Sequence, residues 1–143
     1  MEQVKFLNEI VASFGVLYIK LHQYHWNLKG KHFFTLHEKL EEIYDGVTEN
    51  LDEVAERIRQ LDAYPVSTLK EFLELSIIKE REYKEMSGSE MVEDLLNDYE
   101  TLNNKYLAGI EEFSSDPVTA DMLTQFAIST QKTVWMLKAY LNK

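Results

Sequence analysis

The fold is decided by residues 36–58, which read LHEKLEEIYDGVTENLDEVAERI. Apolar side chains recur there every three or four residues, at Leu36, Leu40, Tyr44, Val47, Leu51, Ala55 and Ile58. This spacing is typical of the buried face of an α-helix. It predicts a helix from about residue 34 or 35 to residue 61, roughly 40 Å long at 1.5 Å per residue.

Three further segments show the same helical periodicity. The first runs from about residue 3 to residue 28, and Gly30 is predicted to end it because glycine readily adopts the left-handed conformation. Ser89 is predicted to cap a third long helix. Asp116 followed by Pro117 predicts the cap and first residue of a fourth.

The connection between the second and third helices is long, about 27 residues, whereas the other two are short. Ser67 or Thr68 is predicted to cap a short helix within it, through Phe72 and Leu75. Short connections indicate antiparallel neighbours, and the long one is sufficient to return along the whole bundle. We therefore expect an all-α, ferritin-like four-helix bundle with one crossover, forming a single domain over residues 1–143.

Composition limits the classes of function. The chain has 143 residues, a formal charge of -10 and no cysteine, so any metal must bind oxygen or imidazole. No apolar run is long enough to cross a membrane and no secretory signal is evident, so we expect a cytoplasmic protein. An acidic surface repels DNA, and the densest basic patch, residues 29–32, is more simply a solvated turn.

Side chains that suit metal binding recur at helical spacing. His25 lies on the first predicted helix, and His37, Glu41, Asp52 and Glu56 lie on the second. His37 and Glu41 are four residues apart, as are Asp52 and Glu56, so each pair shares one helix face. Because imidazole and carboxylate are both metal ligands, each pair is able to clamp one ion.

The two pairs cannot meet on one helix, because the eleven residues from Glu41 to Asp52 span about 16 Å. A second copy, packed antiparallel about a two-fold axis, would place His37 opposite Glu56 and Glu41 opposite Asp52. Both pairings are centred between residues 46 and 47, next to Gly46, where a missing side chain lets backbones approach. A site inside one bundle is disfavoured, because no histidine follows a glutamate in a Glu-x-x-His motif.

Several motifs resemble the Dps family of mini-ferritins, and the similarity spans nearly the whole chain. They are His25-Trp26, Gly30, Phe33-Phe34, Leu36-His37-Glu38-Lys39, the LDEVAER of residues 51–57, the STLKEF of residues 67–72 and the WMLKA of residues 135–139. The resemblance implies a homo-dodecamer, a hollow shell of twelve subunits built from two-fold dimers. Its iron-oxidising (ferroxidase) sites would lie at the two-fold interfaces.

Carried over by position, the resemblance implies that His25, His37 and Glu41 of one subunit meet Asp52 and Glu56 of its partner. Each site would take two Fe(II) ions, oxidise them with hydrogen peroxide or dioxygen, and release ferric iron for storage in the cavity. The cell would thereby be protected from oxidative damage. Family members often have aspartate at the position of Glu41, which affects how the second iron is held.

The resemblance also suggests roles for residues outside the ligand set. Trp26, beside His25, would intercept stray oxidising equivalents, and Trp135 is a second candidate; the alternative is that both tryptophans pack the core or an interface. Acidic residues near the last connection line iron channels in the family, and Glu112, Asp116 and Asp121 lie there. Asp116 and Asp121 are equally explained as a helix cap and a favourable first-turn acid.

Two other functions compete with iron oxidation. One is a DNA-binding, nucleoid-compacting protein with weak ferroxidase activity; we expect no direct DNA binding, because Lys5 is the only cation near the start and no lysine-rich tail is present. The other is an interaction scaffold, which has no need of the histidine and carboxylate set. His22 and His32 are expected to be structural or surface residues.

Overall fold

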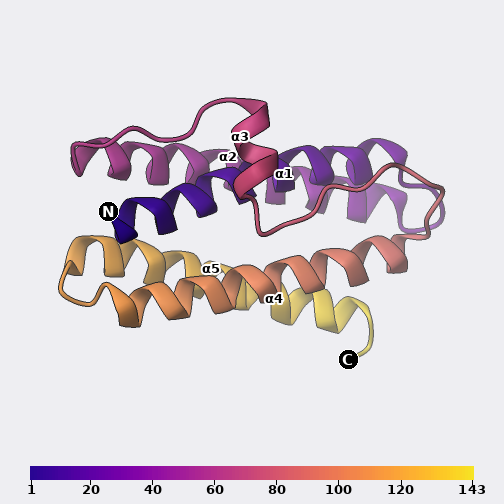
Figure 1. The fold of residues 1–143 in the computed structure, drawn as a ribbon. Coiled ribbons are helices and arrows are strands. Elements are labelled where there is room, and N and C mark those ends of the chain that lie inside the picture. The colour runs from indigo at the N-terminus through magenta and orange to yellow at the C-terminus, as the bar shows by residue number, and fades with distance from the viewer. The chain divides into compact units, whose positions relative to one another are not determined.

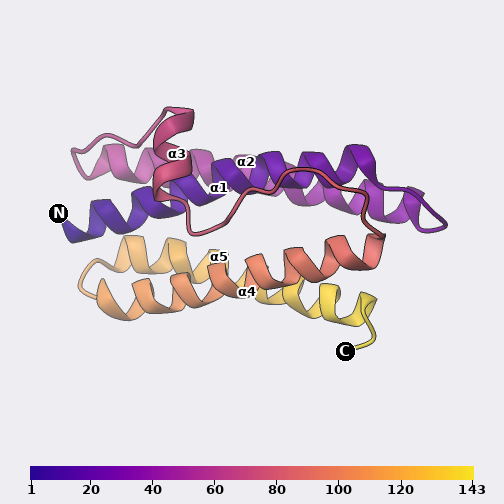
Figure 2. The same cartoon turned by 45° about the vertical axis from the view of Figure 1, so that its right-hand side comes forward.

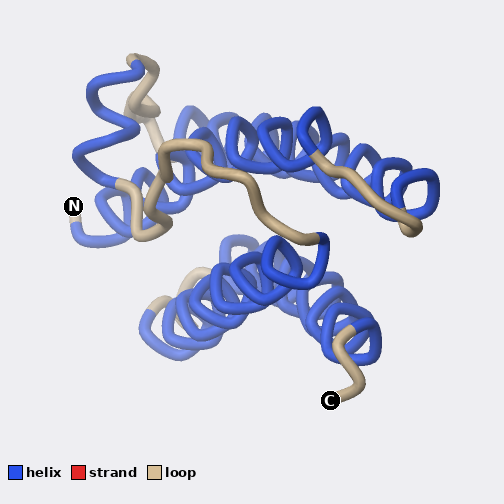
Figure 3. The backbone as a smooth tube through the Cα atoms, turned by 90° about the vertical axis from the view of Figure 1, so that its right-hand side faces the viewer, coloured by secondary structure: helices blue, strands red, loops and turns tan.

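The computed structural model describes all 143 residues and contains five helices and no strands (Figures 1 and 3). The helices are α1 (Glu2–Asn27), α2 (Phe33–Gln60), α3 (Leu69–Leu75), α4 (Gly88–Glu112) and α5 (Pro117–Tyr140). The predicted all-α class and the short crossover helix are therefore confirmed. None of the helices has the length and apolar character that a membrane span requires.

The chain divides into two compact units, Met1–Gly88 and Ser89–Lys143. In the first unit, α1 and α2 form an antiparallel pair (Figures 1 and 2). The side of α2 that faces the core carries Leu36, Leu40, Val47, Val54 and Ile58. Half of the residues of α1 are buried, and they are spread along the helix between Phe6 and His25. The single domain over residues 1–143 stays a prediction.

The crossover follows α1 along much of its length. Three hydrogen bonds of 2.9 Å join its backbone to side chains of α1, in the pairs Val66–Asn8, Ile77–Ser13 and Arg81–Gln23. These side chains provide partners for backbone groups that no regular structure satisfies. Ile78 and Met86 are the buried apolar anchors of the same segment.

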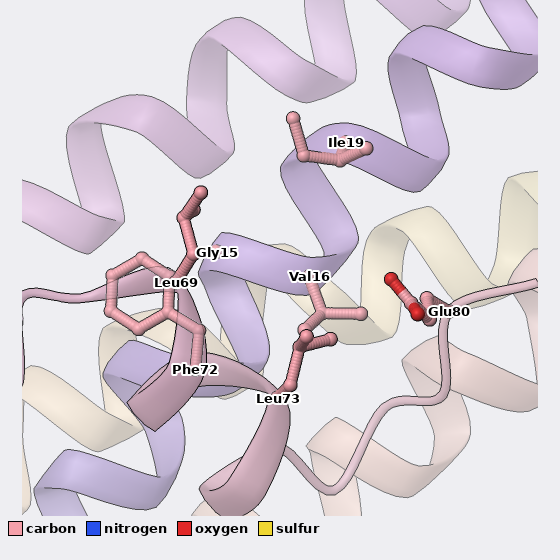
Figure 4. Close-up of a pocket in the computed structure, with 7 residues that line it drawn as sticks. All are labelled: Gly15, Val16, Ile19, Leu69, Phe72, Leu73 and Glu80. Atoms are coloured by element: carbon pink, nitrogen blue, oxygen red, sulfur yellow. The ribbon is translucent and has the colours of Figure 1, made fainter.

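The short helix α3 is held against α1 by a close approach at Gly15 (Figure 4). A Cβ atom at Gly15 would overlap the ring of Phe72. At its start, Thr68 accepts a hydrogen bond from the backbone N–H of Glu71, which confirms Thr68 as the cap. Beside this contact lies a mostly apolar cavity of about 250 Å³, whose walls come from α1, α3 and Glu80.

In the second unit, α4 and α5 form an antiparallel pair. Tyr106 of α4 packs on Phe126 of α5 with ring centroids 5.6 Å apart. The predicted cap is confirmed: the side chain of Asp116 accepts from the backbone N–H of Thr119 at 3.2 Å and from its hydroxyl at 2.7 Å. Pro117 is the first helical residue, where its missing N–H costs no hydrogen bond.

Two predicted helix ends are wrong in detail. The first helix ends at Asn27 because Leu28 turns to extended backbone, with φ -57° and ψ 140°. Gly30 does have a positive φ of 111°, but it serves the turn that follows rather than the helix end. The third long helix, α4, already begins at Gly88, so Ser89 lies inside its first turn and is not its cap.

Candidate metal centre

His25 and His37 form a reciprocal pair where the end of α1 meets the start of α2. The Nδ1 atom of each ring lies 2.8 Å from the backbone carbonyl oxygen of the other histidine. Their rings stack with centroids 3.6 Å apart and planes 13° from parallel. Because a carbonyl only accepts hydrogen bonds, each Nδ1 carries a proton, so in the neutral ring it is Nε2 that has the lone pair for a metal.

Glu41 brings a carboxylate to this pair. Its Oε1 lies 3.7 Å from the Nε2 of His25, and its side chain is 55% exposed, whereas that of His25 is buried. Two ligand atoms about 2.1 Å from one ion lie roughly 3.0–3.4 Å apart. A small rotation of the exposed carboxylate therefore suffices for a cation to bridge the two groups.

Asp52 and Glu56 lie on the exposed side of α2, farther along the helix. No three or more of the chain's histidine and acidic side chains are grouped closely enough to hold a metal ion. Within one copy, His25 stacks on His37 and its Nε2 lies 3.7 Å from Glu41, so the predicted ligands meet there only as these two pairs. Asp52 and Glu56 are not brought to them.

Gly46 lies on a different face of α2 from the predicted ligands, and the expected close approach of two backbones stays a prediction. At about 100° per residue, the side-chain direction at Gly46 lies roughly 130° from the mean direction of the four predicted ligands on α2. Asp45 and Thr48, placed symmetrically about the same centre, lie on the ligand face instead. Apart from its two chain neighbours and the nearby backbone of α2, no atom of the chain lies within 4 Å of a Cβ built at Gly46.

The structure shows how exposed the predicted redox and channel residues are. Trp26 and Trp135 are 68% and 66% exposed, so neither packs the core of its unit. Glu112 and Asp121 are exposed near the connection between α4 and α5. Asp116 has the capping role that the sequence offered as its alternative explanation.

Two aromatic residues that were not predicted to belong to the site, Phe33 and Tyr44, contact the histidines. Phe33 stacks on the far face of His37, with centroids 4.7 Å apart and planes 21° from parallel. Tyr44 meets His25 edge-on at 5.2 Å and stacks on His22 at 3.8 Å. The spacing indicates both contacts, because Phe33 lies one helical turn before His37 and Tyr44 lies two turns after it, on the same face of α2.

Tyr44 also contacts a carboxylate ligand. Its side chain hydrogen-bonds to that of Glu41. Partial burial, followed by the neighbouring charges of Glu41 and Asp45, raises the pKa of Tyr44. The phenol therefore keeps its proton at neutral pH and donates it in this hydrogen bond.

Known proteins resemble the chain over its full length. The ferritin-like domain matches residues 4–143. A DNA protection during starvation protein (Dps) of Listeria innocua is 44% identical over 142 residues, which cover 97% of this chain and 91% of that protein.

Solved structures agree with the sequence relatives. The X-ray structure of Dps from Listeria monocytogenes matches with a TM-score of 0.96 at 43% identity, covering 99% of this chain and 94% of that one. A Listeria innocua Dps structure soaked with zinc matches with a TM-score of 0.94 at 44% identity, covering 99% and 97%. The predicted ferritin-like fold is thus confirmed, and the chain belongs to the Dps family of ferritin-like proteins.

Proposed function

We propose that this protein is an iron-oxidising and iron-storing mini-ferritin whose ferroxidase sites are shared between two copies of the chain. The reciprocal pair of His25 and His37 carries the proposal, because both Nδ1 atoms are used in hydrogen bonds, which leaves the Nε2 atoms for a metal, and the Nε2 of His25 lies 3.7 Å from the carboxylate of Glu41. Asp52 and Glu56 of a second copy would supply the other carboxylates. Twelve copies, assembled from two-fold dimers, would enclose the stored iron.

The chemistry follows from the ligand types. Imidazole nitrogens suit Fe(II), and carboxylates offset the charge as Fe(II) becomes Fe(III). Two Fe(II) ions give one electron each, and hydrogen peroxide takes both electrons with two protons to form two water molecules. Because the electrons leave as a pair, no hydroxyl radical is released. Dioxygen is the alternative electron acceptor.

Iron access and radical control are assigned to residues outside the ligand set. Glu112, Asp116 and Asp121 are proposed to line an acidic channel that draws Fe(II) inward. Asp116 would do so while capping α5. Trp26 is proposed to intercept stray oxidising equivalents, since its exposed ring lies 5.3 Å from that of His22, three residues before His25.

DNA protection is the function that the relatives' name states. We propose that this chain protects DNA indirectly, by consuming Fe(II) and peroxide, because its formal charge of -10 opposes contact with phosphates. Tight binding in a gel-shift assay at low salt and low magnesium would favour the alternative, a DNA-compacting protein with weak ferroxidase activity.

The direct test is oxidation of anaerobically loaded Fe(II) after peroxide is added. The assembled protein should give a fast ferric absorbance, and the combined His25→Ala and His37→Ala variant should lose it. His32→Ala is the matched control, because His32 is an exposed histidine that is not one of the proposed ligands. An unchanged rate in the double variant, or a monomer in native sizing, would contradict the proposal.

A further inference from the structure

Tyr44 touches two of the predicted ligands at once. Its ring meets that of His25 edge-on, with centroids 5.2 Å apart and planes at 90°. Its side chain also hydrogen-bonds to Glu41, one turn earlier on α2. The same Glu41 carboxylate lies 3.7 Å from the Nε2 of His25. Tyr44 therefore contacts both the imidazole of His25 on α1 and the carboxylate of Glu41 on α2, and restricts how the two groups lie relative to each other.

Aromatic side chains of α1 pack against the ring of Tyr44. The ring of His22 stacks on it, with centroids 3.8 Å apart and planes 24° from parallel. His22 is fixed in turn, because its Nδ1 donates to the backbone carbonyl of Tyr18 at 2.7 Å. The ring of Tyr18 meets that of Tyr44 at 6.2 Å. This support leaves the phenol little freedom to turn away from Glu41.

Glu41 needs such support more than the histidines do. Its side chain is 55% exposed, and a free glutamate loses considerable rotamer entropy when a ligand fixes it. A hydrogen bond that already restricts the carboxylate reduces this loss. It also engages part of the carboxylate, so that the group favours binding a metal through one oxygen.

We propose that Tyr44 is a positioning residue of the metal centre, orienting Glu41 through its hydroxyl and His25 through its ring. This inference rests on the proposed function, because it assumes that His25 and Glu41 bind the metal. Tyr44 itself is not a ligand in this proposal. It acts through Glu41, so its effect should vanish when Glu41 is absent.

The test measures metal affinity rather than turnover. Co(II) is titrated anaerobically into the assembled protein, and binding is followed by the visible absorption of the ion. Tyr44→Phe keeps the ring contacts and removes the hydroxyl, so Co(II) should bind about tenfold more weakly. The half-saturating Fe(II) concentration should rise similarly, while the maximal oxidation rate stays within about twofold. Tyr83→Phe, a crossover tyrosine with 38% exposure, is the matched control.

A double-mutant cycle with Glu41→Ala completes the test. Adding Tyr44→Phe to Glu41→Ala should weaken Co(II) binding no further, whereas additive losses would overturn the proposal. Unchanged Co(II) affinity in Tyr44→Phe would overturn it too, even if Fe(II) oxidation slowed. Failure of the wild-type protein to oxidise Fe(II) would instead reject the proposed function, and the Co(II) comparison would still test the positioning.

Discussion

Mixed assemblies offer a sharp test of a site shared between copies. A chain with His25→Ala and His37→Ala keeps the acidic half of the site, and a chain with Asp52→Ala and Glu56→Ala keeps the histidine half. Each variant assembled alone should be inactive, since every site lacks one half. A two-fold pair of unlike chains has two different sites. One site combines the intact histidines of one chain with the intact acids of the other, and the second site combines the two mutated halves.

The expected recovery follows from the symmetry. Random co-assembly of equal amounts makes about half of the pairs unlike, and each unlike pair has one working site of two, so about a quarter of wild-type activity should return. The assay is the initial rate of ferric absorbance after anaerobic Fe(II) loading and peroxide addition. The two chains are unfolded and reassembled together.

The control uses the same two variants assembled separately and then mixed. This mixture should stay inactive, because no unlike pairs form. If co-assembly gives no more activity than the control, the histidine and acidic halves do not combine across copies, and the reasoning from spacing on α2 fails. The outcome does not depend on how tightly either half binds iron by itself.

Three further predictions concern stability. Gly46→Ala should raise the free energy of unfolding by about 1 kcal/mol, or the melting temperature by roughly 3 °C, because alanine favours the helix and the added Cβ meets no atom beyond the nearby backbone of α2. A lower melting temperature or a smaller assembly in sizing would instead support a close approach of two backbones at Gly46. Gly15→Ala should destabilise the protein by about 1–3 kcal/mol through overlap with Phe72, and should speed proteolysis at α3; unchanged melting and cleavage would contradict this. Burial raises the pKa of Tyr99 and of Tyr106, so the two protonated phenols contribute fully to the free energy of unfolding below pH 10. This contribution is lost as the pH rises, and the loss reaches about 1.4 kcal/mol for each tyrosine at pH 11. Combined Tyr99→Phe and Tyr106→Phe should therefore flatten the fall in denaturant stability between pH 9 and 11, and an unchanged slope would argue against it.

Much of the fold could be predicted because it depends on local chemistry. The start of α5 came from Asp116 and Pro117, whose roles as cap and first residue depend on neighbours a few positions away. The end of α1 was placed wrongly because glycine signals a positive φ but not which residue of a turn needs it. Leu28, a residue without any such signal, ends the helix.

The candidate site was predictable to the extent that helical spacing determines it. Periodicity placed His37 and Glu41 on one face of α2, and the family resemblance implied that His25 joins them; the structure brings His25 and His37 together. Periodicity did not reveal the reciprocal hydrogen bonds, which depend on the turn between the helices. Nor did it identify Tyr44 as more than an apolar position, because its contacts with His22 and Glu41 arise from packing between helices.

The way His25 and His37 hold each other affects how the site tolerates change. Each ring is anchored by the backbone carbonyl of the other residue, and every amino acid has such a carbonyl. Replacing one histidine therefore removes one ligand and one stacking neighbour, but leaves the tautomer and anchor of the other intact. A lineage that lost one imidazole would keep a half-built site, from which a single substitution restores the pair.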